Sequence, residues 1–396
     1  MLVSSARVLV APQAFKGSLS AAGVAEAIAA GLPAAVSAEL LPVADGGEGT
    51  VDALLTALGG ERRSTLVQDP LGRTVEARWG LLADGRVIVE MAAASGLPLL
   101  EPKKRDPRRA STYGTGQLIA AALDAGARDI VVGIGGSATN DGGAGALQAL
   151  GVRLLDSSGK ELPRVVIHLQ RLTTIDWSGL HPGMREARLR VMCDVSNPLL
   201  GPTGATAVYG PQKGVNAAMQ PRIEAALARW AEVVERGAGS RKSGVGSREP
   251  RLREVPGAGA AGGLGFGLLA LGATLEPGAQ LILDLIAFDQ KLHSADLVIT
   301  GEGRIDGQSL YGKSTIAVAR RAKRAGVPVL AIVGSLGDGY EACYREGVDA
   351  IVPIATEPLS LEESQARAAE LIREATARAF RIIALGSHYA SRARRQ

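Results

Sequence analysis

The segment Gly301–Thr315 combines the residue types that bind phosphate groups and a divalent metal ion. It follows an apolar run and places charged side chains among glycines. Carboxylates are the protein ligands that Mg²⁺ prefers, and cations beside glycine turns neutralise phosphate. The charged residues are Glu302, Arg304, Asp306 and Lys313. The segment therefore predicts a site that handles phosphate and a metal.

The second half of this segment, Gly307–Ser314, matches the P-loop pattern G-x-x-x-x-G-K-S. A P-loop begins where its strand ends, so that its backbone wraps the phosphates at the start of the next helix. Here the predicted strand Leu297–Thr300 ends well before the motif, and the best Walker B candidate, Arg190–Asp194, precedes it. We therefore expect a fortuitous match, with Lys313 as a point charge for phosphate and Ser314 as an ordinary helix start. A P-loop NTPase remains an alternative.

Two further polar turns follow predicted strands in the N-terminal part of the chain. Lys16 stands in Pro12–Ser18, where a cation and the N–H groups of a helix start together suit an anion. By itself, that segment is more typical of an ordinary loop with a solvated lysine. Asp45 and Glu48 lie three residues apart on a glycine turn, so both can face one Mg²⁺ ion or hydroxyl group. An acidic helix cap explains this second turn equally well.

The glycine-rich loop Gly135–Gly145 lies between a predicted strand and a predicted helix. Its glycines let a ligand approach the backbone closely. A purely structural loop rarely needs so many polar groups beside so many glycines, so the pattern favours a binding site. The polar residues are Ser137, Thr139, Asn140 and Asp141.

Another polar region follows the predicted strand that ends at Cys193. Asp194 can accept a substrate proton or hold a metal, and Lys213, in the glycine turn Gly210–Gly214, can neutralise phosphate. Cys193 is better explained as strand core than as a nucleophile, because no histidine stands near it. None of the four histidines lies in a motif. This pattern argues against metal–histidine chemistry and Ser-His-Asp hydrolysis.

The segment Gly257–Gly262 matches G-x-G-x-x-G, the fingerprint of Rossmann dinucleotide sites. It follows a charged stretch that ends in Pro256 instead of a buried strand, so close glycine–alanine packing explains it as well. A Rossmann-type oxidoreductase acting on a small hydroxy acid remains an alternative, and so does a ligand sensor without turnover.

The amino-acid composition indicates which classes of partner the protein binds and in which cellular compartment it works. Among 396 residues, 44 basic and 40 acidic side chains nearly balance, and no basic stripe is interleaved with aromatic residues, which argues against nucleic acid. No apolar run approaches the length of a membrane span. Two cysteines exclude a disulfide framework and favour a reducing cytoplasm. We expect a cytoplasmic protein with a small-molecule substrate and no membrane partner. The oligomeric state stays open, with a homodimer as one option.

The elements that position these residues alternate between strand and helix at both ends of the chain, as in a doubly wound fold. The middle contains short alternating runs and turns that are typical of antiparallel hairpins. The pattern predicts strands at 7–10, 40–44, 63–67, 73–82, 86–91, 129–134, 189–193, 297–300, 329–333 and 350–354, helices at 21–31, 50–58, 116–125, 217–236, 314–325 and 361–381, and a mobile surface loop at 237–254.

We therefore expect an α/β protein with two domains. Parallel βαβ units cover one another best when they are contiguous in space, so residues 1–62 and 290–396 are predicted to share one sheet. Residues 63–289 are predicted to form an inserted mixed α/β domain. The segment 116–150 could belong to either domain.

Taken together, these segments resemble the class I glycerate kinases, a family without P-loop ancestry. The motifs run in the family's order and cover nearly the whole chain. Two departures are Ser314, where the family usually has proline, and the segment Gly237–Arg253, which looks longer than usual. The motifs are Phe15–Ser18, Ala44–Gly49, Gly114–Gly116, Gly135–Gly143, Cys193–Asp194 with Asn197–Pro198, Gly210–Gly214, Gly257–Gly265, and Gly301–Asp306 with Gly312–Lys313.

The resemblance implies a kinase that uses ATP and Mg²⁺ to phosphorylate D-glycerate, with 2-phospho-D-glycerate as the expected product of in-line phosphoryl transfer. It also implies that the domain with the mainly parallel sheet is Rossmann-like, that the second has a mixed sheet, and that the active site lies in the cleft between them. We expect Asp194 to orient or deprotonate the attacking hydroxyl group, with Lys16 and Arg304 as further catalytic residues. The candidate metal ligands are Asp45, Glu48, Glu302 and Asp306. The candidates for substrate or nucleotide binding are Ser137, Thr139, Asn140, Asp141, Asn197, Lys213, Gln308 and Lys313.

Overall fold

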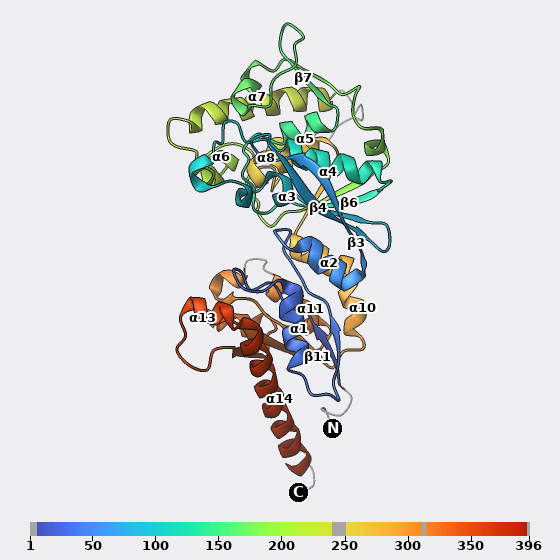
Figure 1. Ribbon diagram of the computed structural model, residues 1–396, viewed down its shortest axis with the longest axis vertical. Helices are drawn as coiled ribbons and strands as arrows, with labels where there is room; N and C mark the ends of the chain where they lie inside the picture. The colour runs from blue at the N-terminus through green and yellow to red at the C-terminus, as the bar shows by residue number, and fades with distance from the viewer. Residues whose placement is uncertain (1–5, 240–250, 311–313, 394–396) are drawn as a thin grey trace. The chain divides into compact units, whose positions relative to one another are not determined.

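The computed structural model describes residues 6–239, 251–310 and 314–393. The chain divides into two compact units (Figure 1). Unit 1 comprises Met1–Asp45, Asp52–Gly59 and Ala279–Gln396, and unit 2 comprises Gly46–Val51 and Gly60–Gly278. The segment 116–150 lies in unit 2.

Unit 1 is built on a five-stranded parallel sheet. Its strands, in spatial order, are β15 (Ala350–Pro353), β13 (Val329–Val333), β11 (Leu297–Thr300), β1 (Arg7–Val10) and β2 (Ser37–Leu40). The two ends of the chain share this sheet, as predicted, because β1 lies between β2 and β11 with Val8 opposite Leu297. The three inner strands are nearly continuous runs of buried apolar residues, the pattern of a parallel sheet covered on both faces.

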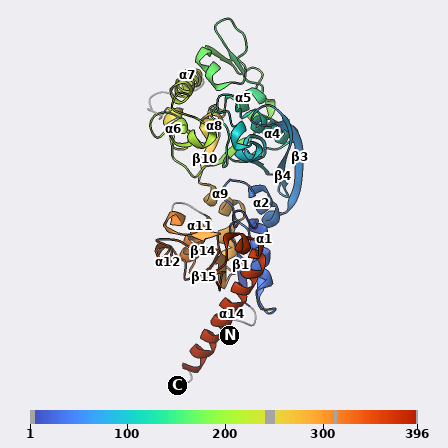
Figure 2. The same ribbon diagram turned by 60° about the vertical axis from the view of Figure 1, so that its left-hand side comes forward.

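Helices surround this sheet, and two that are far apart in the sequence lie side by side. The helices of unit 1 are α1 (Ala21–Ala30), most of α2 (Thr50–Leu58) and α9 (Gly278–Leu285), α10 (Phe288–Leu292), α11 (Ser314–Arg324), α12 (Ala342–Arg345), α13 (Leu361–Ala366) and α14 (Ala368–Ala393). The Ser20 side chain caps α1 by accepting a hydrogen bond from the Gly23 N–H over 3.1 Å. Helices α1 and α14 pack together against the sheet through residues such as Val24, Ile28 and Ile372 (Figure 2).

The predicted bounds of two elements in unit 1 are wrong. Residues 41–44 lie beyond β2, which ends at Leu40. The Leu41 and Val43 N–H groups still bond to Val10 and Pro12 over 2.8 and 3.0 Å. The predicted helix 361–381 is two helices, α13 and α14, separated at Arg367.

Unit 2 contains a six-stranded mixed sheet. Its strands, in spatial order, are β10 (Thr274–Glu276), β9 (Arg188–Met192), β6 (Asp129–Gly133), β5 (Val87–Glu90), β4 (Thr74–Leu82) and β3 (Gly60–Gln68). Strands β3, β4 and β5 are antiparallel, as their turn residues predict, whereas β5, β6, β9 and β10 are parallel. The carboxyl ends of β6 and β9 therefore lie at the same edge, with Val132 opposite Val191.

The remaining elements of unit 2 are mostly helical. They are α3 (Ala92–Ser95), α4 (Tyr113–Asp124), α5 (Ala144–Ala149), α6 (Ala205–Tyr209), α7 (Gln220–Gly239), α8 (Ala260–Ala270), the short strands β7 (Arg153–Leu155) and β8 (Thr174–Asp176), and the 3₁₀ turns η1 (Leu97–Leu99), η2 (Pro102–Lys104), η3 (Val166–Arg171), η4 (Pro182–Arg185), η5 (Pro211–Lys213) and η6 (Leu252–Glu254). Unit 1 adds the short strands β12 (Arg304–Ile305) and β14 (Ser335–Leu336) and the 3₁₀ turn η7 (Gly307–Leu310).

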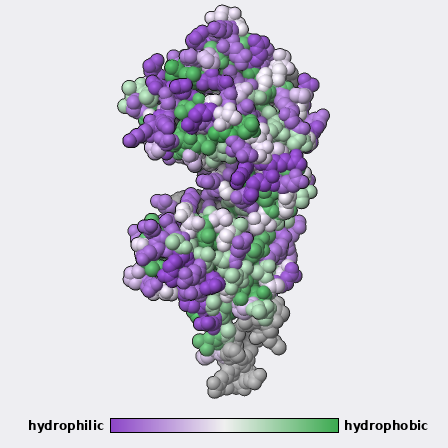
Figure 3. Space-filling view, viewed as in Figure 1, coloured by the Kyte–Doolittle hydropathy of each residue, from purple (hydrophilic) through white to green (hydrophobic). Residues whose placement is uncertain are grey.

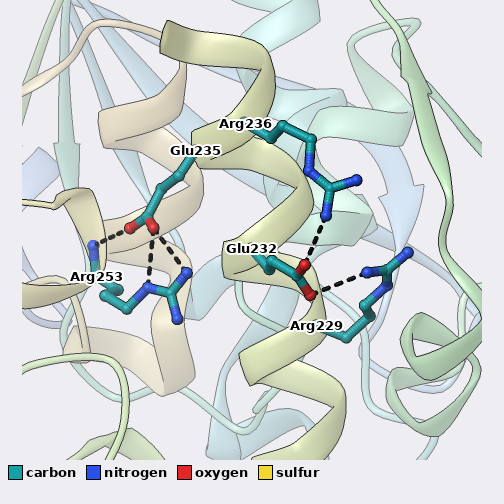
Figure 4. A network of polar contacts seen from close by, with 5 residues as sticks. All are labelled: Arg229, Glu232, Glu235, Arg236 and Arg253. Carbon is teal, nitrogen blue, oxygen red and sulfur yellow. Dashed lines mark hydrogen bonds and ion pairs between the residues drawn. The ribbon is translucent and has the colours of Figure 1, made fainter.

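The far end of the predicted loop 237–254 is anchored to α7. Arg253 donates hydrogen bonds to Glu235 from its backbone N (3.0 Å), Nε (2.9 Å) and Nη2 (2.7 Å) (Figure 4). Glu232, on the same helix, accepts from Arg229 and Arg236. The start of the predicted loop is helical, because α7 continues to Gly239, and residues 240–250 lie outside the described residues.

Within the described ranges, no helix is both long enough and apolar enough to span a membrane. On the face shown in Figure 3, hydrophilic residues are interspersed with hydrophobic ones over both units.

Candidate active site

In unit 1, the polar loops after three adjacent strands are joined by one buried residue, Gln13. Its backbone N–H donates to the Gly301 carbonyl oxygen over 2.8 Å, and its Nε2 donates to Asp45 Oδ2 over 2.9 Å. Gln13 follows β1, Asp45 lies beyond β2, and Gly301 directly follows β11. Because these strands are parallel neighbours, Asp45 and Glu302 lie at the same edge of the sheet.

The segment just beyond β11 carries three of the predicted residues, Glu302, Arg304 and Asp306. Glu302 is only 4% exposed, and its backbone carbonyl accepts from the Gly334 N–H over 3.1 Å. Arg304 Nε lies 3.3 Å from Asp306 Oδ2, and Asp306 Oδ1 accepts from the Gln308 N–H over 2.9 Å. This arrangement holds the Asp306 carboxylate beside a cation.

Two of the three remaining predicted residues of this region lie at the surface. Lys16 and Gln308 are exposed, and Lys313 lies outside the described residues. Helix α11 comprises Ser314–Arg324 among the described residues, and the Ser314 hydroxyl donates to the Ala44 carbonyl oxygen over 2.8 Å. The 3₁₀ turn η7 occupies the first half of the P-loop match, well beyond the end of β11. This placement differs from a P-loop, whose backbone turns at the strand end.

The candidate metal ligands are carboxylates, a ligand type that fits a Mg²⁺ ion. In the described part of the chain, no three His, Cys, Asp or Glu side chains gather as a metal cluster. Mg²⁺ commonly takes only one or two protein carboxylates and fills its other positions with water and phosphate oxygens. The Asp45 carboxylate, which accepts a hydrogen bond from Gln13, is a ligand of this type.

In unit 2, the turn that carries Glu48 lies against the glycine loop after β6. The Gly135 N–H donates to the Gly46 carbonyl oxygen over 3.1 Å, and the Val51 N–H donates to Glu90 Oε1 over 2.6 Å. A Cβ atom on Gly133 would lie 2.4 Å from the Gly46 oxygen, so only glycine allows this approach. Glu48 itself is exposed.

Asp141 holds the glycine loop together. Its carboxylate accepts hydrogen bonds from the N–H groups of Thr112 (2.8 Å), Gly143 (3.1 Å) and Gly145 (3.3 Å) and from the Thr112 hydroxyl. Burial raises the pKa of Asp141, and these donors oppose the rise. With so many donors from the protein, its oxygens serve the loop.

Lys213, the last residue of η5, contacts the same loop. It is only 1% exposed, and its Nζ donates to the Thr139 carbonyl oxygen over 2.8 Å. Burial lowers the pKa of Lys213 to about 7, and the charge of Asp141 opposes this effect. Asn140 Nδ2 donates to Thr206 Oγ1 over 3.1 Å, which ties the loop to α6.

The Gly257–Gly262 segment packs against the glycine loop. Ala261, Gly262 and Gly263 have left-handed backbone conformations, and the Gly142 N–H donates to the Gly262 carbonyl oxygen over 3.0 Å. A Cβ atom on Gly262 would lie 2.0 Å from the Thr139 carbonyl oxygen. The segment follows the 3₁₀ turn η6, not a strand, so it lacks the setting of a dinucleotide fingerprint and serves close packing.

Asp194 and Asn197 follow β9. Asp194 is exposed, and its Oδ1 accepts from the Gly278 N–H over 2.7 Å, which fixes the carboxylate near the strand end. Asn197 Nδ2 donates to the Thr203 carbonyl oxygen, and Asn197 Oδ1 accepts from the Tyr209 hydroxyl, each over 2.8 Å. Burial raises the pKa of the Cys193 thiol, which disfavours the thiolate needed for nucleophilic attack.

Three residues that organise these loops were missed in the sequence. Gln13 stands in the Lys16 segment, but an amide gave no charge signal. Thr112 and Thr206 bond to Asp141 and Asn140 from positions distant in the chain. Ser137, which was predicted, is 7% exposed at the start of the loop.

Comparison with known proteins places these loops in a family. The model of the glycerate kinase family matches residues 8–384. The chain belongs to the glycerate kinase family. The family resemblance seen in the motifs is therefore confirmed, and the protein is an enzyme, a phosphotransferase of this family. A kinase of this family implies ATP as the phosphate donor.

Individual relatives agree with the family assignment. A Bacillus subtilis glycerate kinase is 48% identical over 94% of this chain and 96% of its own length. An Escherichia coli glycerate 2-kinase is 43% identical over 96% of this chain and 98% of its own length. A crystal structure from Salmonella typhimurium LT2, described provisionally as glycerate kinase 2, has 42% identity and a TM-score of 0.86 and covers 97% of this chain and 100% of that one. The predicted α/β fold, with a mainly parallel and a mixed sheet, is thus confirmed.

Proposed function

We propose that this glycerate kinase family member transfers the γ-phosphoryl group of ATP to D-glycerate, with Mg²⁺, and releases 2-phospho-D-glycerate. The observation that carries the proposal is the 43% identity with the E. coli glycerate 2-kinase over nearly the full length of both chains. The chemistry of the loops supports it, because they combine carboxylates, cations and buried polar groups at strand ends. Phosphoryl transfer needs such positioning and charge neutralisation more than covalent catalysis.

In this proposal, Asp194 accepts the proton of the attacking hydroxyl group, or orients that group. A base must reach the proton that it takes, and the hydrogen bond from the Gly278 N–H holds the Asp194 carboxylate in a defined place beyond β9. Lys16 and Arg304 neutralise phosphate charge as it shifts between the leaving and attacking oxygens. Gln308 and Lys313 bind the nucleotide.

When bound, Mg²⁺ supplies charge neutralisation for the phosphate oxygens. The residues that would hold it, directly or through water, are Asp45, Glu48, Glu302 and Asp306. Gln13 orients Asp45 for this task through its Nε2 contact. Arg304 places a positive charge beside the Asp306 carboxylate, with its Nε 3.3 Å from Asp306 Oδ2.

Ser137, Thr139, Asn140, Asn197 and Lys213 are the proposed binding residues of unit 2. Asp141 supports them by fixing the loop backbone through its bonds to Thr112 and Gly143.

A coupled assay of ADP release, with a panel of small hydroxy acids and MgATP, tests the proposal. We expect D-glycerate to be the preferred acceptor, with L-glycerate, lactate and tartronate weaker. Absence of ADP release with D-glycerate would overturn the proposed function.

A further inference from the structure

Three neighbouring side chains in unit 2 are buried while part of their hydrogen-bonding capacity is unused. Thr139 and Asn140 are 0% exposed, and Thr139 Oγ1 and Asn140 Oδ1 have no hydrogen-bond partner among the described residues. Lys213 is 1% exposed, and within the described ranges its ammonium group, with three donors, makes one hydrogen bond, to the Thr139 carbonyl oxygen. Buried polar groups without partners are costly, so native proteins keep few of them.

The donor and acceptor properties of these atoms specify which ligand groups could form hydrogen bonds with them. Asn140 Nδ2 already donates to Thr206 Oγ1, so the side chain has an acceptor, Oδ1, to offer. A ligand must therefore present a donor to Asn140 and an acceptor to Lys213, while the Thr139 hydroxyl can play either part. A hydroxy acid carries both kinds of group within a few bonds. The triphosphate of a nucleotide offers acceptors alone at neutral pH, so it leaves Asn140 Oδ1 unpaired.

We propose that Thr139, Asn140 and Lys213 form the subsite for the hydroxy-acid substrate, with the substrate carboxylate against Lys213 and a substrate hydroxyl group against Asn140 Oδ1. This inference rests on the proposed function and assigns these residues to glycerate instead of the nucleotide. Asp141 is a positioning residue in this subsite, because its carboxylate bonds to the loop and to Thr112. Since all three side chains are closed to solvent, the glycine loop or the turn η5 must shift to admit the substrate.

The substitution Thr139→Val tests the subsite, because it removes the hydroxyl group and keeps the backbone carbonyl that Lys213 contacts. The hydroxyl has no partner in the protein, so we expect the ligand-free Tm to stay the same or rise. We expect the KM for D-glycerate and its Kd in the presence of ADP to rise about tenfold, the weight of one lost hydrogen bond. The KM for ATP should change by less than about twofold, on the same arithmetic.

Thr376→Val is the matched control. Thr376 is also buried, but its hydroxyl donates to the Ile372 carbonyl oxygen over 2.9 Å within α14. This variant should lower the Tm and leave the KM for D-glycerate unchanged.

The outcomes separate the inference from the function on which it rests. If the unsubstituted protein releases no ADP with D-glycerate, the proposed function fails. If that protein is active and Thr139→Val leaves the KM for D-glycerate unchanged, the subsite is wrong. A shift in the KM for ATP alone would assign these residues to the nucleotide, and a Tm loss like that of Thr376→Val would show that the hydroxyl has a structural partner. Both results would overturn the inference.

Discussion

Lys213 Nζ donates a hydrogen bond to the backbone carbonyl oxygen of Thr139 over 2.8 Å. This contact joins two glycine-rich segments that are far apart in the sequence and places a buried amine beneath the loop after β6. Burial lowers the pKa of the amine to about 7, so it gains and loses its proton near neutral pH. The ammonium form of Lys213 therefore provides a positive charge at the loop, and a carboxylate ligand can stabilise that charge.

The first prediction concerns proton uptake when substrate binds. A glycerate carboxylate beside Lys213 would stabilise the ammonium form and raise its pKa from about 7. At pH 8 the free protein holds mostly the neutral amine, so binding D-glycerate should take up a proton, and affinity should fall as the pH rises above 7. Calorimetric titrations in buffers of different ionisation enthalpy measure the uptake. The charge of Asp141 acts on Lys213, and Arg105 donates a hydrogen bond to the neighbouring Gln212 carbonyl oxygen over 3.1 Å.

A Lys213→Met variant is the control for this pH dependence, and proton uptake should disappear in it. Its stability gives a second check. The pKa of lysine is about 10.4 in an unfolded chain and about 7 here, so between those values the unfolded state binds more protons. The contribution of Lys213 to the unfolding free energy therefore rises with pH from about 7 to about 10. Any stability advantage of Lys213→Met should shrink over the same range, and an advantage independent of pH would contradict the account.

The second prediction concerns the base. Asp194→Asn should lower kcat by roughly 10²–10⁴-fold, because a lost general base typically costs that much. The amide retains an oxygen for the Gly278 N–H, so the fold should survive. Asp176→Asn, in the short strand β8 of the same unit, is the control and should keep normal turnover. Near-normal turnover of Asp194→Asn at saturating glycerate would remove Asp194 from the base role.

Much of the fold follows from local sequence signals. The bounds of β11 and β13 were predicted correctly because both are short apolar runs between turns. The helix Thr50–Leu58 was also correct. The position of β2 was missed, because its paired residues Ser37–Leu40 are half exposed at the sheet edge, whereas the buried apolar run lies just beyond it.

For the candidate site too, some features could be predicted from the sequence and others could not. Charged residues on glycine turns, such as Asp45 and Asp194, are visible as motifs. The support of Asp45 by Gln13 and the contact between Lys213 and Thr139 depend on tertiary packing, which spacing does not encode. The sequence also could not separate Asp141, whose oxygens bond to the loop, from its neighbour Asn140, which keeps an acceptor to offer.

The third prediction concerns the metal. Asp45→Asn should raise the Mg²⁺ concentration needed for half-maximal ADP release at fixed ATP, because a neutral amide is a weaker ligand than a carboxylate. Titration of activity with Mg²⁺ measures the change. Asp296→Asn is a matched control in unit 1, since Asp296 bonds to the Arg7 N–H at the amino end of β11, the opposite edge of the sheet. Equal Mg²⁺ requirements in the two variants would exclude Asp45 as a ligand.

The fourth prediction concerns the packing of α8 against the glycine loop. Gly262→Ala and Gly272→Ala both place a side chain at positive φ, +70° and +91°, at a strain cost of about 1–2 kcal/mol. Only Gly262→Ala also drives a Cβ atom to within 2.0 Å of the Thr139 carbonyl oxygen, whereas Gly272 has open space. We expect its unfolding free energy to fall by a further ~1–3 kcal/mol and its KM for D-glycerate to rise. Equal denaturation midpoints for the two variants would contradict the packing account.

The most direct test of the proposed reaction is the proton-coupled ³¹P NMR spectrum of the product formed from D-glycerate and MgATP. In 2-phospho-D-glycerate the phosphorus couples to the single hydrogen on the adjacent carbon, so the account predicts a new phosphate-ester doublet that grows in step with ADP. A triplet, the signal of a phosphate on the terminal CH₂ group, would contradict the assigned product. ADP without any phosphate ester would contradict phosphoryl transfer to glycerate altogether.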